Sequence, residues 1–244
     1  FVIGDVPLVE RAPLKEGQRD DTALITQYSL DSAEAVGLVK MDFLGLSNLT
    51  IIENALDIIQ AVHDVTIDID TIPLDDEKTF KLLGRGETIG VFQLESDGMR
   101  RYIKDLKPTE FEDIVAMVSL YRPGPLSAGM VPQYINRKNG REKVVYDHPL
   151  MEDILRETYG VTIYQEQIMK ISRALAGFTA GEADTLRKAM GKKKREVLAK
   201  MFTSFIDGCI KNGVKKSIAQ KIWKDWEGFA DYAFNKSHAA CYGL

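Results

Sequence analysis

The sequence has few of the features that would place it in several large classes of protein. Of its 244 residues only two are cysteines, Cys209 and Cys241, which is too few for a disulfide framework and suits a reducing cytosol. No apolar run approaches the roughly 20 residues that a membrane-spanning helix needs. The residues that follow Phe1 lack the basic start and long apolar stretch of a signal peptide. We therefore expect a cytoplasmic protein that makes no use of a membrane.

Several catalytic and metal-binding motifs are also missing. There is no G-x-x-x-x-G-K-[ST] sequence, which excludes a P-loop ATPase, and no signature of a serine or cysteine nucleophile. His238 and Cys241 are spaced as zinc ligands can be, but no second pair accompanies them. We therefore expect no structural zinc site.

Positive charge is scarce in most of the chain and concentrated near its end. Residues 1–185 contain 19 basic and 31 acidic side chains, whereas residues 186–244 contain 13 basic and 5 acidic ones. Six of these cations lie between Arg187 and Arg195, where they repel one another unless solvent or a polyanion lies against them. This asymmetry points to a nucleic-acid or phosphate partner. A solvated helix face is the alternative interpretation of the run.

The residue pattern predicts a strand-rich start followed by a helical remainder. Residues 22–28 and 36–44 have the β-branched and aromatic content of strands. Asn48 can cap a helix whose apolar residues recur at helical spacing as far as Val62. We expect an α+β, mainly α, fold with a domain boundary near residues 46–48. The two domains would then comprise residues 1–47 and 48–244.

Capping boxes and amphipathic patterns predict further helices. The box at residues 109–112 opens a helix that runs to about Leu120. The box at residues 179–182 opens another that ends at Gly191. Three apolar side chains of this second helix are expected to face inward: Ala183, Leu186 and Met190. Two more helices are expected over residues 196–211 and 217–227.

A first candidate site lies in the second predicted strand. Lys40 and Asp42 are two residues apart and so share a face, while Val39, Met41 and Phe43 would point into a core. A lysine beside an aspartate suits a phosphate and a divalent metal, although an isolated pair is more commonly an ordinary exposed ion pair. Two-metal chemistry needs several carboxylates. The aspartates of residues 68–70 lie beside an acidic turn, and we interpret them as part of a solvated loop.

A second candidate site lies at the end of the helix that stops at Gly191. Arg187 and Lys188 fall in its last turn, where the helix dipole favours cations by about 0.3–1 kcal/mol. Their position alone therefore requires no ligand. Four further cations exceed what one helix end needs, and this excess favours a phosphate partner: Lys192, Lys193, Lys194 and Arg195.

Two further cations lie at a predicted helix start. Asn235 or Ser237 can cap the short segment that follows, which places Lys236 and His238 where the helix dipole disfavours positive charge. An anion held between them would remove the conflict, because helix starts bind phosphate readily. A solvated lysine and a hydrogen-bonded histidine are the alternative. Arg122 begins a rigid turn at residues 121–125, which we interpret first as a helix stop and only second as a nucleotide or template contact.

Seven segments, in this order, resemble the bacterial C-family replicative DNA polymerases, the alpha subunits of DNA polymerase III. They cover essentially the whole chain: residues 39–46, 72–76, 91–96, 121–125, 159–167, 186–194 and 234–238. The resemblance implies that residues 1–47 are the end of a palm like that of the polymerase-beta-like nucleotidyltransferases. It implies that residues 48–244 are most of the helical fingers. Because the chain begins at Phe1 and ends within an apolar stretch, we interpret it as a piece of a longer protein.

The resemblance also assigns roles to residues. The family's palm holds two Mg²⁺ ions on three aspartates, of which Asp42 matches the third, a catalytic metal ligand. Lys40, Arg187, Lys188 and His238 match positions that contact the incoming nucleotide. Lys188 stands where relatives often have arginine, so it keeps the charge without the bidentate fork. Further contacts to phosphate or DNA are expected from five cations: Arg122, Lys192, Lys193, Lys194 and Lys236.

The parent protein would be a DNA-directed DNA polymerase of chromosomal replication, acting on primer–template DNA and deoxynucleoside triphosphates. The resemblance places its contacts with replicase holoenzyme subunits and the sliding clamp outside this chain. The other two aspartates belong to a D-x-D motif that precedes Phe1 in the family, so we expect the chain alone to be inactive. One alternative is a non-catalytic helical module that binds nucleic acid through its basic end. Another is a structural scaffold with no affinity for DNA.

Overall fold

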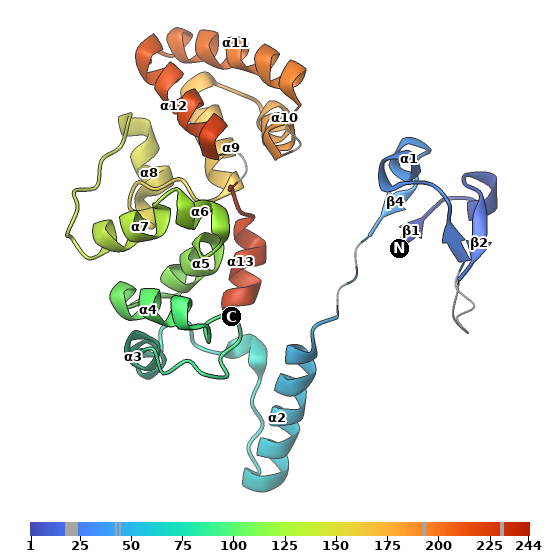
Figure 1. The fold of residues 1–244 in the computed structure, drawn as a ribbon, viewed down its shortest axis with the longest axis vertical. Helices are drawn as coiled ribbons and strands as arrows, with labels where there is room; N and C mark the ends of the chain where they lie inside the picture. The colour runs from blue at the N-terminus through green and yellow to red at the C-terminus, as the bar shows by residue number, and fades with distance from the viewer. Residues whose placement is uncertain (18–23, 42, 44, 192–193, 230–231) are drawn as a thin grey trace. The chain divides into compact units, whose positions relative to one another are not determined.

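The chain folds into two compact units, Phe1–Ile69 and Asp70–Leu244. The structure, a computed structural model, describes residues 1–17, 24–41, 43, 45–191, 194–229 and 232–244 (Figure 1). Helices dominate, and the strands form two small antiparallel pairs. The expected α+β, mainly α, class is therefore confirmed. No described helix combines the length and the apolar character needed to cross a bilayer.

The strands all lie in the first unit. They are β1 (Val2–Ile3), β2 (Leu14–Glu16), β3 (Leu24–Thr26) and β4 (Val39–Lys40). β1 pairs with β4, with Val2 opposite Lys40, and β2 pairs with β3. A 3-10 turn, η1 (Leu8–Glu10), and helix α1 (Leu30–Ala35) complete this part. Its small core is formed by three buried side chains: Ala12, Ala33 and Leu38.

The prediction of a strand over residues 36–44 is mostly wrong. Among the described residues of this stretch (36–41 and 43), only Val39–Lys40 form a strand, because α1 ends at Ala35 and Val36 is its C-cap. Gly37 follows with a φ of 84°, a left-handed conformation that glycine adopts without strain. The β-branched content of this stretch concealed a helix end and a turn. Residues 22 and 23 lie outside the described part of the chain, so the first predicted strand is described only from Leu24.

The predicted facing of β4 is also wrong within this unit. Val39, Met41 and Phe43 are 60%, 43% and 69% exposed. The even-numbered residues face inward instead: Leu38 is buried and Lys40 is half-buried. The Lys40 ammonium lies 3.6 Å from the Glu34 carboxylate of α1. Asp42 lies outside the described residues.

Helix α2 (Ser47–His63) starts two residues earlier than a cap at Asn48 predicts. Leu46, rather than Asn48, occupies the N-cap position, and no side chain caps the helix there. The predicted helical spacing is present, but none of the α2 residues is buried. Leu49, Ile51 and Ile58, for example, are each more than half exposed. The pattern thus predicts the helix correctly, and its apolar residues are not buried in this structure.

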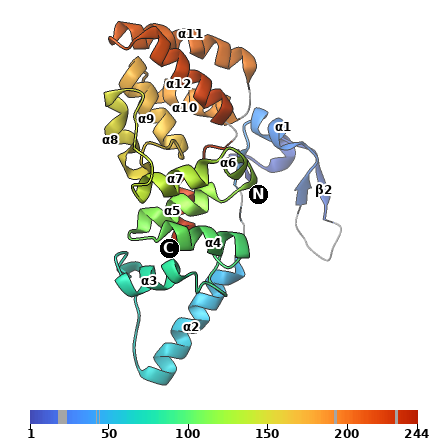
Figure 2. The ribbon, with the colours of Figure 1, turned by 60° about the vertical axis from the view of Figure 1, so that its left-hand side comes forward.

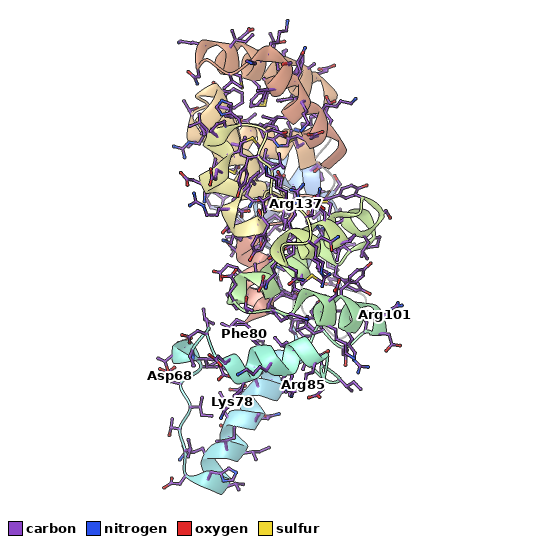
Figure 3. All side chains as sticks on the ribbon, turned by 90° about the vertical axis from the view of Figure 1, so that its left-hand side faces the viewer. Asp68, Lys78, Phe80, Arg85, Arg101 and Arg137 are labelled. Carbon is purple, nitrogen blue, oxygen red and sulfur yellow. The ribbon has the colours of Figure 1, made fainter. Side chains whose placement is uncertain are left out.

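The second unit is helical throughout its described part. Its elements, which begin at the boundary between the units, are η2 (Ile69–Thr71), α3 (Glu77–Arg85), α4 (Asp97–Leu106), α5 (Phe111–Leu120), α6 (Pro123–Ser127), α7 (Met130–Lys138), η3 (Pro149–Met151), α8 (Glu152–Leu155), η4 (Arg156–Thr158), α9 (Gln165–Ala176), α10 (Ala180–Gly191), α11 (Arg195–Lys211), α12 (Lys216–Phe229) and α13 (Lys236–Gly243). Asp68 and Asp70 lie with exposed side chains in or beside the turn η2. Figure 3 shows Asp68 on the connection after α2.

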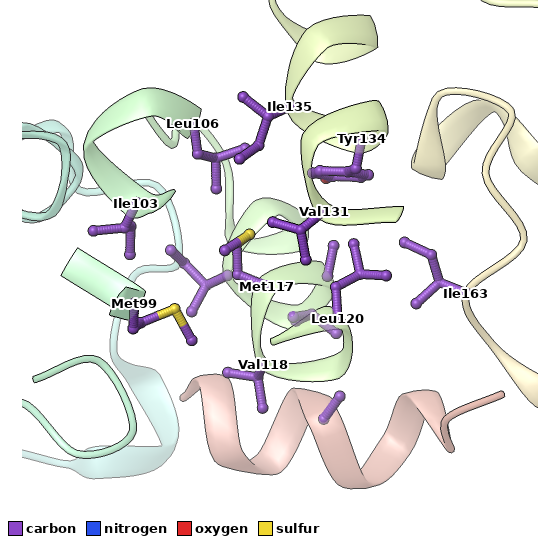
Figure 4. Packing of buried hydrophobic residues seen from close by; sticks show 14 of the residues in the cluster. Met99, Ile103, Leu106, Met117, Val118, Leu120, Val131, Tyr134, Ile135 and Ile163 are labelled. Carbon is purple, nitrogen blue, oxygen red and sulfur yellow. The ribbon is translucent and has the colours of Figure 1, made fainter. Parts of the chain in front are cut away.

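Two hydrophobic cores organise this unit. The first surrounds α5 and contains side chains of α4, α7 and α13, among them Ile103, Met117 and Ile135 (Figure 4). Phe80 of α3 packs against it, whereas Lys78 on the same helix is exposed (Figure 3). α13 lies along α5, as Figure 1 shows. These helices therefore hold the C-terminal segment in place.

The second core joins α9, α10, α11 and α12 (Figure 2). Phe205, Trp223 and Trp226 form its aromatic centre, with ring centroids 5.1 to 6.2 Å apart. Cys209 is buried here, and burial raises the pKa of its thiol to about 11. The predicted inward side chains of α10 are all buried: Ala183, Leu186 and Met190. This core sets the position of α10.

The structure confirms one capping box and corrects the other. At α10, Thr179 N–H and Oγ1 both donate to Glu182 at 2.8 Å, as predicted. At α5 the capping carboxylate is Asp113, which accepts from Thr109 N–H at 2.9 Å, rather than the predicted Glu112. Glu112 is exposed, whereas Asp113 is fully buried. The two predicted C-terminal helices are present as α11 and α12.

Asp113 also takes part in a buried ion pair. Its carboxylate lies 3.2 Å from the Lys138 ammonium, which is itself nearly buried, and accepts from the Tyr134 hydroxyl at 3.2 Å. We predict that Asp113→Ala lowers the free energy of unfolding by about 3–5 kcal/mol, because it leaves the Lys138 charge buried and unpaired. Urea denaturation measures the loss. Glu112→Ala, an exposed neighbour, is the matched control and should change stability by less than about 0.5 kcal/mol. Equal losses would contradict the prediction.

Candidate phosphate-binding site

A short backbone pairing brings two distant parts of the second unit together. Phe234 N–H donates to Ile163 O at 3.0 Å, and Gln165 N–H donates to Phe234 O at 2.9 Å. These bonds form a parallel bridge between Tyr164 and Phe234. The segment that leads into α13 is thereby fixed against the start of α9. Residues 163–165 and 232–235 will be called the junction.

Gln165 extends the junction to α10. Its side-chain Oε1 accepts from Arg187 Nη1 at 3.4 Å, and its Nε2 donates to Ala233 O at 3.4 Å. One amide group therefore contacts both the candidate cation on α10 and the segment before α13. The sequence alone gave Gln165 no role, because both of its partners are distant in the chain.

Arg187 and Lys188 share one carboxylate. Arg187 Nε and Nη2 lie 2.9 and 2.8 Å from Asp184 Oδ1, and Lys188 Nζ lies 2.8 Å from Asp184 Oδ2. The hydrogen bond from Lys188, followed by that from Arg187, lowers the pKa of Asp184 below its ordinary value. Sequence reasoning missed Asp184, although its spacing of three and four residues from the cations is the signal of a helix ion pair.

The start of α13 carries its own anions. Asn235 is the N-cap, as predicted, and its Oδ1 accepts from His238 N–H at 2.8 Å. Glu166 accepts from Lys236 N–H at 3.1 Å and from Asn235 Nδ2 at 3.0 Å. Lys236 Nζ donates to Glu157 at 2.5 Å. These two carboxylates supply the negative charge for which the sequence suggested a phosphate.

His238 lies one turn into α13 with an exposed side chain. Its ring centroid is 4.4 Å from that of Tyr242 and 5.5 Å from that of Phe234. Two aromatic rings thus fix the orientation of the imidazole. Because Phe234 belongs to the junction, the position of His238 depends on the same pairing that Gln165 extends toward Arg187.

Arg122 ties the end of α5 to the junction. Its Nε donates to Ser119 O at 2.8 Å, its Nη2 donates to Tyr232 O at 2.6 Å, and the guanidinium lies 4.4 Å from the Phe234 ring centroid. Burial lowers the pKa of Arg122. A Cβ on Gly124 would lie 2.1 Å from Tyr232, so this approach requires glycine there. α5 ends at Leu120, so the predicted helix stop is present, but Pro123–Ser127 form helix α6 rather than a rigid turn. Arg122, the N-cap residue of α6, is also a clamp that the sequence did not reveal.

The remaining predicted site residues lie in the first unit, at an exposed position after α10, or outside the described residues. Lys40 belongs to the first unit, and the described structure gives Lys194 as exposed. Asp42, Lys192 and Lys193 lie outside the described residues. Among those that are described, no three His, Cys, Asp or Glu side chains are arranged to hold a metal ion.

The carboxylate of Glu166 should keep the first turn of α13 in place. We predict that Glu166→Ala increases amide hydrogen exchange of Lys236 by about 5- to 30-fold, because it removes the acceptor of that N–H group. Glu166→Gln keeps one acceptor oxygen and should have a smaller effect. Exchange monitored by mass spectrometry measures both. Glu53→Ala on α2, in the other unit, is the control, and an equal response to it would contradict this assignment.

Comparisons with known proteins match this chain along nearly its whole length. The family described as "Bacterial DNA polymerase III alpha subunit finger domain" matches residues 48–213. The family described as "Bacterial DNA polymerase III alpha NTPase domain" matches residues 1–45.

Similar proteins include DNA polymerase III subunit alpha of Aquifex aeolicus, 51% identical over 242 residues, or 99% of this chain and 21% of the relative. The same subunit of Staphylococcus aureus strain COL is 51% identical over 99% of this chain and 22% of the relative. That of Mycobacterium tuberculosis strain H37Rv is 48% identical over 100% of this chain and 21% of the relative. The chain thus spans about a fifth of the length of these relatives.

Proposed function

The chain belongs to the family of bacterial DNA polymerase III alpha subunits, and from this premise we propose that it forms part of the polymerising centre of a DNA-directed DNA polymerase. Residues 1–47 would be the end of the palm, and residues 48–244 would be most of the fingers. The family that the seven sequence segments indicated is thereby confirmed. The chain's contribution to catalysis is the proposal that follows.

The proposed reaction is template-directed attack of a primer 3′-hydroxyl on the α-phosphate of a deoxynucleoside triphosphate, with release of pyrophosphate. The supporting observation is the pair of cations near the C-terminal end of α10, Arg187 and Lys188, which both contact the carboxylate of Asp184; of the two, Lys188 lies in the last turn. Positive groups held in this way neutralise a bound triphosphate and stabilise the charge that develops on the leaving pyrophosphate. Gln165 links Arg187 to the junction, and the junction also orients His238. We therefore assign His238 to the sugar or phosphates of the same nucleotide.

The palm residues would contribute to the same reaction. We propose that Lys40 contacts the triphosphate and that Asp42 is a catalytic ligand of two Mg²⁺ ions. One carboxylate does not make a two-metal site, and no described cluster of carboxylates adds to it. The other ligands would come from outside this chain.

The basic residues after α10 fit the role of contacts to DNA. Lys236 and Arg122 bind Glu157 and Tyr232 O respectively, so a phosphate would have to compete with these protein groups for them. Lys192, Lys193 and Lys194 remain as proposed contacts to phosphates of the primer–template. Partners such as the sliding clamp would bind regions of the parent protein outside this chain.

Replacement of Asp42 separates the polymerase from the non-catalytic binding module. In the full-length parent we predict that Asp42→Asn abolishes nearly all primer extension while primer–template affinity is kept, because the change removes a metal ligand. The 244-residue chain alone should not extend a primer. Gel-based extension with Mg²⁺ and fluorescence anisotropy with labelled DNA measure the two quantities. Full activity of the variant would refute the catalytic role of Asp42, and Mg²⁺-dependent extension by the chain alone would refute the need for metal ligands outside it.

Replacement of Arg187 tests the phosphate contact. In the parent polymerase we predict that Arg187→Ala lowers kcat/KM for the deoxynucleoside triphosphate by about 10²- to 10³-fold, because a charged donor at the leaving group is lost. Arg187→Lys should recover only part of this, since lysine lacks the fork. Single-nucleotide incorporation kinetics measure both. Arg173→Ala, an exposed arginine on α9, is the matched control, and a similar loss there would contradict the assignment.

A further inference from the structure

The two cations that we assign to the triphosphate are already occupied by an internal anion. Asp184 places one carboxylate oxygen on Arg187 and the other on Lys188, each within 2.9 Å. A phosphoryl group offers the same arrangement, two negatively charged oxygens on one centre. In the structure, Asp184 therefore occupies the place that a phosphate of the substrate would take on these side chains.

Asp184 occupies an edge of the guanidinium that could otherwise bind a phosphate. Nε and Nη2 form one of the forked edges through which arginine binds a carboxylate or a phosphate with two parallel hydrogen bonds. Both of these nitrogens point at Asp184 Oδ1. Nη1 points instead at Gln165, at the longer distance of 3.4 Å. A phosphate that binds the Nε–Nη2 edge must displace Asp184, whereas it need not displace Gln165.

The exchange is physically accessible. The side chains of Arg187, Asp184 and Lys188 are 31%, 35% and 63% exposed. Ion pairs that solvent reaches are weak, because water screens the attraction and the side chains lose freedom when they pair. A triphosphate carries several negative charges and can outcompete one carboxylate, whereas a singly charged anion has no such advantage.

We propose that Asp184 is a specificity-determining residue that competes with the substrate's phosphates for Arg187 and Lys188. In the free protein the carboxylate holds both cations, and it gives them up when a triphosphate enters. When pyrophosphate leaves, Asp184 takes the cations back. The residue thus lowers the affinity of the site for every anion, and only a polyphosphate overcomes this. The inference rests on the proposed function, because it assumes that the two cations contact a triphosphate.

Asp184 could otherwise do one of two simpler things. As a pair with residues three and four positions later on α10, it could only stabilise the helix. As a positioning group, it could hold Arg187 in the orientation that the substrate needs. The three roles differ in the sign of one measurement. Removing the negative charge should strengthen polyphosphate binding if Asp184 competes, leave it unchanged if Asp184 is structural, and weaken it if Asp184 positions the cation.

The test uses Asp184→Asn in the 244-residue chain, because asparagine keeps the shape and one acceptor oxygen. The probe is inorganic tripolyphosphate, followed by isothermal titration calorimetry in EDTA, so that no metal ligand outside the chain is needed. We expect the variant to bind the probe about 3- to 10-fold more tightly than the unmodified chain, with the difference shrinking as salt is added. Asp207→Asn on α11 makes the same charge change at an exposed position and should leave the affinity within about twofold.

Arg187→Ala, alone and combined with Asp184→Asn, tests the role of Asp184 separately from the proposed contact between Arg187 and phosphate. Loss of binding in both Arg187→Ala proteins, with tighter binding by Asp184→Asn, supports the inference. Loss of binding on Arg187→Ala, with equal or weaker binding by Asp184→Asn, overturns the inference and leaves the proposed function standing. If the unmodified chain fails to bind, or binds as well without Arg187, both fail. Thermal melting of each protein checks the fold, and a lower melting temperature of Asp184→Asn with unchanged affinity would assign the residue a structural role and overturn the inference.

Discussion

The parallel pairing of Tyr164 with Phe234 is the constraint on which the candidate site depends. Its two backbone hydrogen bonds hold Phe234 beside Ile163 and Tyr164, and all three residues pack in the first hydrophobic core. Ala239 of α13 is buried in the first core, and Leu186 of α10 is buried in the second. Each core fixes its own helix, but neither fixes one helix against the other. The junction does this with Gln165, and the clamp of Arg122 on Tyr232 and Phe234 holds the junction itself to α5.

The positive side chains described at the junction and at the start of α13 have carboxylate or carbonyl partners. Lys236 has Glu157, the start of α13 has Glu166, and Arg122 has backbone carbonyls. Within the strongly basic residues 186–244, Arg187, Lys188 and Lys236 lie beside carboxylates. Other described lysines of this segment have exposed side chains: Lys194, Lys200, Lys211, Lys215, Lys216 and Lys224. Lys188 is 63% exposed and Lys236 is 35% exposed, so Lys188 is the more accessible of these two to a ligand.

Local signals in the sequence predict local structure well here, and they fail wherever the partner is remote. The capping box at Thr179 and the cap at Asn235 each lie within four residues of their acceptors or donors, and both are present. The clamp of Arg122 is invisible in the sequence, because Tyr232 is 110 residues away. The facing of β4 failed for a different reason. Alternation fixes which residues share a face but not which face is covered, and Gly37 shifted the strand start, so that Leu38 rather than Val39 reaches the core.

The asymmetry between the two cations of α10 explains why one of them is an arginine. When a phosphate displaces Asp184, Lys188 loses the ion pair that orients it and acts as a mobile point charge. Arg187 keeps the hydrogen bond from Nη1 to Gln165. Its guanidinium therefore keeps its position relative to the junction, and through the junction relative to His238. A lysine at position 187 could not hold both groups at once with a fixed planar geometry. The fork of Arg187 thus lets the same side chain release an internal anion and remain part of the scaffold that positions the nucleotide.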